Sequence, residues 1–125
     1  MIKILIAEDD ATIGKILKIS LKNWGYEVAG VATNLPEALA EAEKAKTKGV
    51  AIAIVDGNLG SCAPGTTRDG EAVAAKLREY APDVRIIAHT GAAEGKYGYI
   101  FVQKPSPPQE MKAAIEKALA MSPTK

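Results

Sequence analysis

The sequence predicts an α/β fold in which a parallel β-sheet is covered by helices on both faces. Short apolar runs typical of buried strands alternate along the chain with segments whose apolar residues recur at helical spacing. Repeated strand–helix units of this kind place successive strands parallel and join them by right-handed crossovers. The chain has 125 residues, 47% of them hydrophobic and 25% charged, so we expect one ordinary globular domain over residues 1–125.

Five short runs rich in Ile, Val and Ala have the composition of strands. They are residues 2–7, 26–31, 50–55, 84–88 and 99–103. The run 50–55 is apolar throughout, as expected of a strand that helices cover on both sides.

The first two helices follow the first and second strands. Gly25 is expected to end the first helix, and Gly49 the second. Thr33 or Asn34 can cap the second helix, which has Pro36 in its first turn. The apolar faces of the two helices are Ile13, Ile16, Leu17, Leu21 and Trp24, and then Leu35, Ala38, Leu39, Ala42 and Ala45.

The last two helices follow the third and fifth strands. Asp69 is expected to cap a helix that runs through Tyr80. Ser106 is expected to cap the final helix, which Pro107 and Pro108 open. Their inward faces are expected to be Val73, Leu77 and Tyr80, and then Met111, Ile115, Ala118 and Leu119.

No regular helix is expected between the fourth and fifth strands. Residues 90–98 contain three glycines and no apolar stripe. Tyr97 and Tyr99 could form a patch for a partner, but we expect one of them to pack in place of the missing helix.

Acidic side chains follow two of the strands. Glu8 and Asp9 come after the first strand, and Asp56 comes after the third. In a parallel sheet these strand ends meet at one edge, so the carboxylates would repel one another unless a cation lay between them. Oxygen ligands without histidine or thiolate favour Mg²⁺, and the backbone carbonyl of Asn58 could add a ligand. Asp10 is interpreted as a helix cap, not as a ligand.

Two further polar residues follow the other strands. Thr90 comes after the fourth strand and could hydrogen-bond a phosphoryl oxygen, whereas Lys104 comes after the fifth and could neutralise one. An aspartate beside a divalent cation and a lysine can attack phosphorus and form an acyl phosphate. Asp56 is the natural nucleophile.

This set of residues, in this order, resembles the receiver domain of bacterial response regulators over essentially the whole chain. The matching motifs are Glu8-Asp9, Asp56, Thr90 and Lys104-Pro105. The resemblance implies a flavodoxin-like three-layer fold with strand order 2-1-3-4-5. The helix that receivers have between the fourth and fifth strands would be reduced or absent here.

The resemblance also implies a function in two-component signalling, in the cytoplasm. Asp56 would accept a phosphoryl group from a histidine kinase or a histidine phosphotransfer protein, with Glu8 and Asp9 binding the required Mg²⁺. Thr90 and Phe101 would then act as a conformational switch that a downstream protein target reads. Beyond slow hydrolysis of its own acyl phosphate, the chain would not be an enzyme.

Two features depart from the usual receiver pattern. The loop over residues 57–69 is several residues longer than usual and could shield the acyl phosphate, contact the kinase or be an inert excursion. Losing the fourth helix would change the usual docking and dimerisation surfaces, and the segment weakly resembles atypical receivers with a Thr-Gly loop.

Three other functions fit part of the pattern. A pseudo-receiver would keep the fold and act through binding alone. A haloacid-dehalogenase-like phosphatase needs an acid two residues after the nucleophile, where this chain has Asn58. A flavodoxin-type cofactor module would place a flavin phosphate against Glu8 and Asp9, which would repel it.

Composition excludes several other classes. The net charge of +1 argues against nucleic-acid binding by bulk electrostatics. The sequence has no membrane-length apolar stretch, and its one cysteine, Cys62, cannot form an internal disulfide. His89 is the only histidine and lies next to Thr90, where it could tune the site or report pH. We expect it instead to be a strand-end residue with a satisfied hydrogen bond. The tail 122–125 leaves no sequence in this chain for an output domain. We expect the domain to stand alone, the alternative being a fragment excised from a longer protein.

Overall fold

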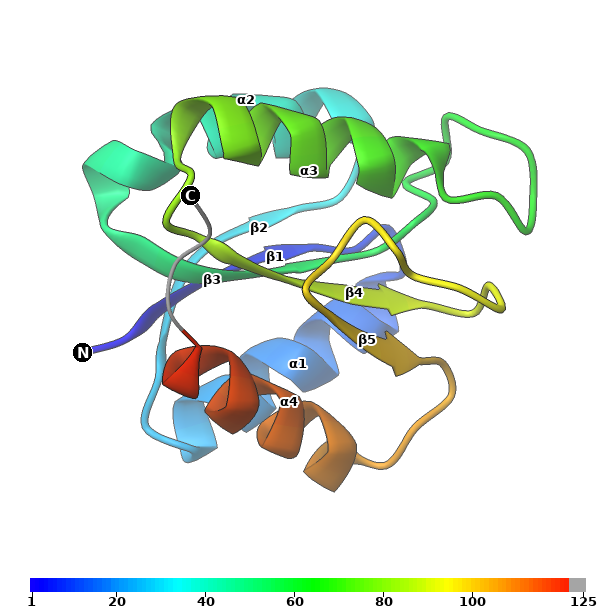
Figure 1. Cartoon of the computed structure of the whole chain (residues 1–125). Helices are drawn as coiled ribbons and strands as arrows, with labels where there is room; N and C mark the ends of the chain where they lie inside the picture. The colour runs from blue at the N-terminus through cyan, green and yellow to red at the C-terminus, as the bar shows by residue number, and fades with distance from the viewer. Residues whose placement is uncertain (122–125) are drawn as a thin grey trace.

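The computed structural model describes residues 1–121, which form a parallel sheet between two layers of helices (Figure 1). The five strands are β1 (Lys3–Ala7), β2 (Glu27–Ala32), β3 (Val50–Val55), β4 (Arg85–Thr90) and β5 (Ile100–Gln103). The four described helices are α1 (Ala11–Asn23), α2 (Leu35–Lys48), α3 (Arg68–Tyr80) and α4 (Pro108–Ala120). The strand order is β2-β1-β3-β4-β5, which confirms the expected flavodoxin-like topology. The C-terminal tail, residues 122–125, lies outside the described residues.

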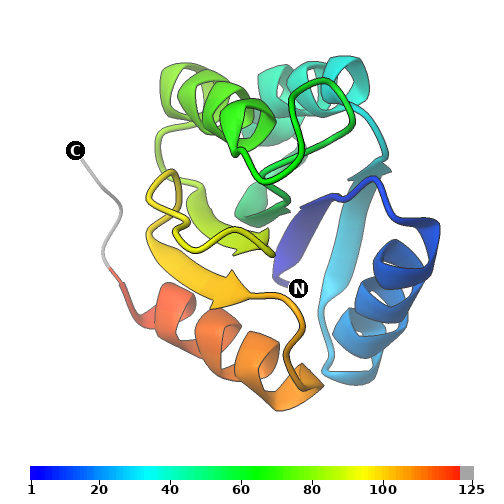
Figure 2. The same ribbon diagram turned by 90° about the vertical axis from the view of Figure 1, so that its right-hand side faces the viewer.

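Each face of the sheet has its own hydrophobic core. Helices α2 and α3 cover one face and α1 and α4 cover the other, as Figure 2 shows from the carboxyl ends of the strands. Alternate residues of one strand point into different cores, because side chains alternate across a strand. In β3, for example, Ala53 and Val55 pack under α2 and α3, whereas Ile52 and Ile54 pack against α1 and α4.

Side-chain caps explain where the first two helices begin. Asp10 accepts hydrogen bonds from the backbone N–H groups of Thr12 and Ile13, which confirms it as the cap of α1. Asn34, not Thr33, caps α2. Gly49 ends α2 with a φ of 74°, a left-handed conformation that glycine adopts without strain.

Two of the expected caps are wrong. The cap position of α3 is Thr67, and Asp69 lies inside the first turn with its side chain buried. The cap position of α4 is Pro107 in place of Ser106, and no side chain makes a capping hydrogen bond there. The carboxylate of Asp69 instead accepts hydrogen bonds from backbone N–H groups of the preceding loop, so it does not cap α3.

Two expected core residues also lie at the surface. Ile16 of α1 is 53% exposed. Tyr80 is 42% exposed, because it is the last residue of α3. Strand β4 is longer than expected, since it includes His89 and Thr90.

Residues 91–99, which connect β4 to β5, contain no helix, as expected. Tyr97 from this segment is buried and belongs to the core beneath α2 and α3. The guanidinium of Arg78 on α3 donates a hydrogen bond of 2.7 Å to the carbonyl oxygen of Tyr97 and lies over the ring of Tyr99. The segment is therefore fastened to α3, and Tyr97 fills the space that a helix would otherwise cover.

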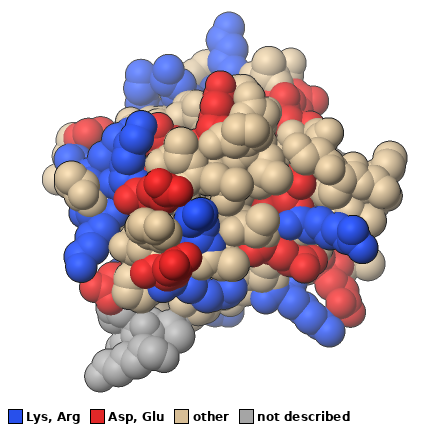
Figure 3. Space-filling model, turned by 90° about the horizontal axis from the view of Figure 1, so that it is seen from above, with Lys and Arg blue, Asp and Glu red and all other residues tan. Residues whose placement is uncertain are grey.

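The face seen from above in Figure 3, which α2 and α3 cover, carries charges of both signs side by side. One pair joins the two helices, with Lys76 Nζ 3.3 Å from Glu43 Oε2. Among the described residues, no helix is both long enough and apolar enough to cross a membrane.

Candidate functional site

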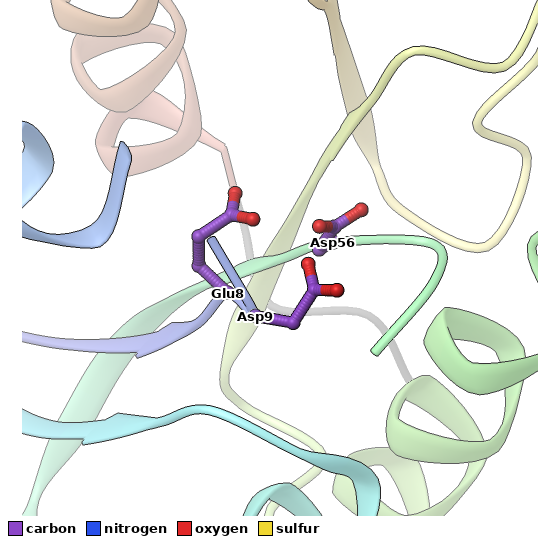
Figure 4. A group of neighbouring side chains, drawn as sticks. All are labelled: Glu8, Asp9 and Asp56. Carbon is purple, nitrogen blue, oxygen red and sulfur yellow. The ribbon is translucent and has the colours of Figure 1, made fainter. Parts of the chain in front are cut away.

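Three carboxylates gather at the carboxyl edge of the sheet (Figure 4). Glu8 and Asp9 directly follow β1, and Asp56 directly follows β3. Each of the three offers an oxygen within 4.8 Å of the others. Glu8 and Asp56 are buried, whereas Asp9 is exposed, so the group opens to solvent on the side of Asp9.

Backbone pairing continues past the strands and fixes the two buried acids. The N–H of Asp56 donates to the carbonyl of Ala7 at 2.8 Å, and the N–H of Glu8 donates to the carbonyl of Ala32 at 2.9 Å. The sheet therefore holds the backbone of both residues, while their side chains lie beyond its edge.

Lys104 joins the two buried acids. Its Nζ lies 2.6 Å from Glu8 Oε1 and 3.0 Å from Asp56 Oδ2, and it donates a hydrogen bond to the latter. The backbone N–H of Lys104 donates to the carbonyl of Thr90 at 2.9 Å, which extends the pairing of β4 with β5. One ammonium among three carboxylates leaves the site with an excess of negative charge.

The burial and the crowding of charge shift several pKa values. Burial, together with the nearby Asp56, raises the pKa of Glu8 to about 8, although Lys104 opposes the shift. The pKa of Asp9 is raised by burial and by Asp56. Burial also acts to raise the pKa of Asp56, but the hydrogen bond with Glu8 and the charge of Lys104 outweigh it and lower the pKa. Asp56 is thus the carboxylate that most strongly keeps its charge.

The pKa of Lys104 is raised. Burial acts to lower it, and the hydrogen bond and charge of Glu8, with the charge of Asp56, outweigh that effect. Lys104 therefore remains a cation at neutral pH.

Thr90 lies beside the acidic group at the end of β4. Its side chain is buried, and its Oγ1 accepts a hydrogen bond of 3.2 Å from the N–H of Ala92. Gly57 allows this closeness, because a Cβ there would lie 3.0 Å from Thr90 Oγ1 and 2.7 Å from Thr67 Cγ2. The Thr90 hydroxyl and Gly57, the residue after Asp56, are therefore neighbours.

Asn58 lies two positions after Asp56 and organises the long loop. Its N–H donates to Asp56 Oδ1 at 3.2 Å, and its side-chain amide donates to the carbonyls of Cys62 and Ala63. The side chain is thus bound within the loop, whereas its backbone lies next to the carboxylates.

Phe101 lies apart from the acidic group. It is on β5, opposite Ala88 in the register of the sheet, and its side chain is 37% exposed. In this structure the residue expected to be the switch aromatic is therefore turned partly to solvent.

Two residues next to the site make contacts that the sequence did not predict. Asp69 Oδ2 accepts the N–H groups of Leu59 and Ser61 at 2.7 and 2.9 Å, so a buried carboxylate holds the base of the long loop. Nδ1 of His89 lies 3.9 Å from Glu8 Oε1 and has no hydrogen-bond partner among the described residues, so the expected satisfied bond is wrong for that atom. Burial and the charge of Lys104 lower the pKa of His89 to about 4.

An apolar cavity of about 220 Å³ adjoins the site. It lies between α1 and the segment that leads into α4, and both Lys104 and His89 reach its wall. Its opening therefore gives access to the lysine from the side of α1.

The donor set fits a small, hard cation. It consists of carboxylate oxygens converging from two strand ends, without sulfur or imidazole among the converging ligands. Mg²⁺ prefers such oxygen ligands and keeps several waters, which the exposed side near Asp9 allows.

Comparison with known proteins gives a family and a set of related structures. Residues 4–116 match the family described as the response regulator receiver domain. No curated protein matches the chain.

Three solved structures share the fold and at least a quarter of the sequence. The chain is 28% identical to the signal receiver domain of a modulated diguanylate cyclase from Desulfovibrio desulfuricans G20, with a TM-score of 0.74 and coverage of 94% of this chain and 92% of that one. It is 27% identical to the response regulator TrrA from Thermotoga maritima, solved with Mg²⁺ and BeF, with a TM-score of 0.74 and coverage of 94% and 99%. It is 25% identical to a CheY-like receiver domain protein from Methanospirillum hungatei JF-1, with a TM-score of 0.76 and coverage of 95% and 94%.

Proposed function

The chain belongs to the response regulator receiver domain family, and on this premise we propose that it is a phosphoacceptor that carries a phosphoryl group on Asp56. The observation that carries the proposal is the contact of Lys104 with Asp56 and Glu8. This contact brings together the unprotonated carboxylate of Asp56, the ammonium of Lys104 and the acid Glu8, which follow three different strands. The site would label itself and hydrolyse its acyl phosphate slowly, without acting on other substrates.

In the proposed reaction, a carboxylate oxygen of Asp56 attacks the phosphorus of a phosphohistidine. A phosphorus–oxygen bond forms as the phosphorus–nitrogen bond breaks, and the imidazole leaves with the bonding electron pair and takes up a proton. Lys104 neutralises charge on the phosphoryl oxygens, and the Thr90 hydroxyl donates a hydrogen bond to one of them. Glu8, Asp9, Asp56 and the carbonyl of Asn58 would hold Mg²⁺, which supplies further charge neutralisation when bound.

We place the phosphodonor, a histidine kinase or a histidine phosphotransfer protein, on the side of α1. The apolar cavity there reaches Lys104. Ile16 of α1 lines it and is 53% exposed, and Ile19 of the same helix is 51% exposed. A donor helix with apolar side chains could bury this surface while its histidine reaches Asp56. The signalling state would then pass to a downstream protein through contacts, in the cytoplasm.

Intact-mass measurement after incubation with phosphoramidate tests the proposal. We expect a gain of one phosphoryl group in the wild type with Mg²⁺ and none with chelator or in Asp56→Asn. Asp83→Asn, the same change at an exposed aspartate far along the chain, is the matched control and should label normally. Full labelling of Asp56→Asn would contradict the assignment. No gain in a folded wild type that binds Mg²⁺ would favour a pseudo-receiver.

Two further variants separate the tasks of the other site residues. We expect Lys104→Ala to label but to show a blunted conformational response, because the cation that links the phosphoryl group to β5 is gone. Asp9→Ala should remove Mg²⁺ dependence together with activity. Labelling that still depends on Mg²⁺ in Asp9→Ala would exclude Asp9 as a ligand.

A further inference from the structure

Tyr97 makes a hydrogen bond directly behind the acceptor. Its hydroxyl donates 2.6 Å to the carbonyl oxygen of Val55, the residue that precedes Asp56. The side chain comes from the segment that replaces a helix between β4 and β5, forty-two positions along the chain, and only 5% of the residue is exposed. A loop residue thus reaches through the core to the backbone of the acceptor.

The ring of Tyr97 also packs near Gly70, which is hydrogen-bonded to Gly57, the residue after the acceptor. Gly70, in the first turn of α3, is so close that a Cβ there would lie 2.7 Å from the Tyr97 Cζ and 2.9 Å from the Cα of Gly57. The N–H of Gly70 donates to the carbonyl of Gly57 at 3.0 Å. Tyr97 therefore supports the backbone on both sides of Asp56, through Val55 directly and through Gly70 and Gly57 by packing.

We propose that Tyr97 is a positioning residue for Asp56, which fixes the backbone of residues 55–57 so that the carboxylate faces the incoming phosphorus and the cation ligands. This inference rests on the proposed function of Asp56 for its kinetic consequence. Its structural consequence, the order of the 55–57 backbone, does not depend on phosphoryl transfer.

The hydroxyl is suited to this task because it stays protonated. Burial raises the pKa of Tyr97 strongly, and the charges of Asp56 and Glu8 raise it further, against a smaller opposing effect of the His89 backbone. A neutral phenol is a hydrogen-bond donor, as the Val55 carbonyl requires. Phenylalanine would keep the ring and its packing and lose only this bond.

Tyr97→Phe tests the inference, with Tyr99→Phe as the matched control. Tyr99 lies two positions away on the same segment, and its ring is partly buried beneath Arg78. With saturating Mg²⁺, we expect Tyr97→Phe to lower the maximal rate constant of phosphoramidate labelling on the order of tenfold, because displacement of a reacting group is costly. The phosphoramidate concentration at half-maximal rate should change little, and Tyr99→Phe should match the wild type.

A second readout needs no phosphodonor. Amide hydrogen exchange at residues 56–58 should accelerate in Tyr97→Phe, and the Kd for Mg²⁺ should rise, in folded protein below its unfolding transition. A lowered melting temperature with unchanged labelling, exchange and Mg²⁺ affinity would mean a merely structural tyrosine and overturn the inference. If the wild type takes up no phosphoryl group, the proposed function fails, and exchange and Mg²⁺ affinity still decide the part played by Tyr97.

Gly70→Ala approaches the same contact from the opposite side. The added methyl would meet both the Tyr97 ring and the Cα of Gly57, without changing any polar group of the site. We expect faster exchange at residues 56–58 and slower labelling, as in Tyr97→Phe. If a folded Gly70→Ala protein shows wild-type amide exchange at residues 56–58 and a wild-type labelling rate, the proposed support of residues 55–57 through Gly70 is contradicted.

Discussion

Gly95 lies directly against the ring of Phe101. A Cβ on Gly95 would come within 2.5 Å of Phe101 Cδ1 and within 2.8 Å of the Ala88 side chain. The backbone of the 91–99 segment thus occupies the space between the aromatic ring and β4. An inward turn of the Phe101 ring, as the receiver family uses, would require this segment to move.

The closeness of Gly95 to the Phe101 ring predicts that Gly95→Ala destabilises the folded protein. Overpacking a buried position costs about 1–3 kcal/mol, so the free energy of unfolding in urea should fall by that amount. Adding Phe101→Ala should restore part of the loss, because the clash then has room to relax. Strict additivity of the two substitutions would show that the ring and Gly95 are not coupled.

The raised pKa of Glu8 predicts a pH dependence in the metal-free protein. The folded-state pKa of about 8 lies above the ordinary value of 4.5, so folding favours the protonated acid. The stability that Glu8 contributes is therefore fully present below pH 4.5 and is lost as the pH rises through about 8. Urea unfolding with chelator, at a series of pH values, should show this loss, and Glu8→Gln should flatten it.

Mg²⁺ binding should have the opposite dependence on pH. A carboxylate must lose its proton to bind a cation, so affinity should rise as the pH increases through the pKa of Glu8, about 8. Calorimetry in two buffers with different ionisation enthalpies would count the proton released at neutral pH. An unchanged Kd between pH 6 and pH 9 would argue that Glu8 is already ionised in the folded protein.

Asp10 adjoins the two acids of β1 but serves α1. Asp10→Ala should lower the free energy of unfolding by about 1 kcal/mol, because the N–H groups of Thr12 and Ile13 lose their acceptor. Asp10→Asn should keep the cap and the stability. Both variants should still label with Mg²⁺, and failure of both in folded protein would instead indicate a charge that the site needs.

Asp69 should control the order of the long loop. Asp69→Ala would leave the N–H groups of Leu59 and Ser61 without their acceptor, at a cost of about 1–3 kcal/mol for a buried group. Amide exchange at residues 59–61 should accelerate. Exchange as slow as in the wild type would show that other contacts hold the loop.

The strand ends could be predicted from sequence because their positions follow from the backbone alone. Once the runs 2–7 and 50–55 are recognised as parallel strands, Glu8 and Asp56 must meet at one edge, as they do. The cap Asp10 was similarly predictable from a local pattern.

The neighbours of the site depend on tertiary contacts that no local pattern contains. Asp69-Gly70 at the start of α3 has the sequence of a helix cap, and only the folded loop explains why the carboxylate turns back to Leu59 and Ser61. The burial of a tyrosine near glycines was expected, but its bond to Val55 spans forty-two positions and has no sequence signal. For His89 the sequence offered either a part in the site or a satisfied strand-end residue, and its closeness to Glu8 depends on the folded sheet.

The four central polar groups of the site come from four different strands: Glu8 follows β1, Asp56 follows β3, Thr90 ends β4 and Lys104 follows β5. Each of these strands pairs with another that supplies a group, so no fragment of the chain could assemble the site alone. If any one of these strands unfolded, the four polar groups would no longer lie together. The Mg²⁺ ligands follow β1 and β3, two strands in the interior of the sheet. Mg²⁺ binding should therefore disappear in a single step that coincides with global unfolding, so that its loss reports how cooperatively the sheet unfolds.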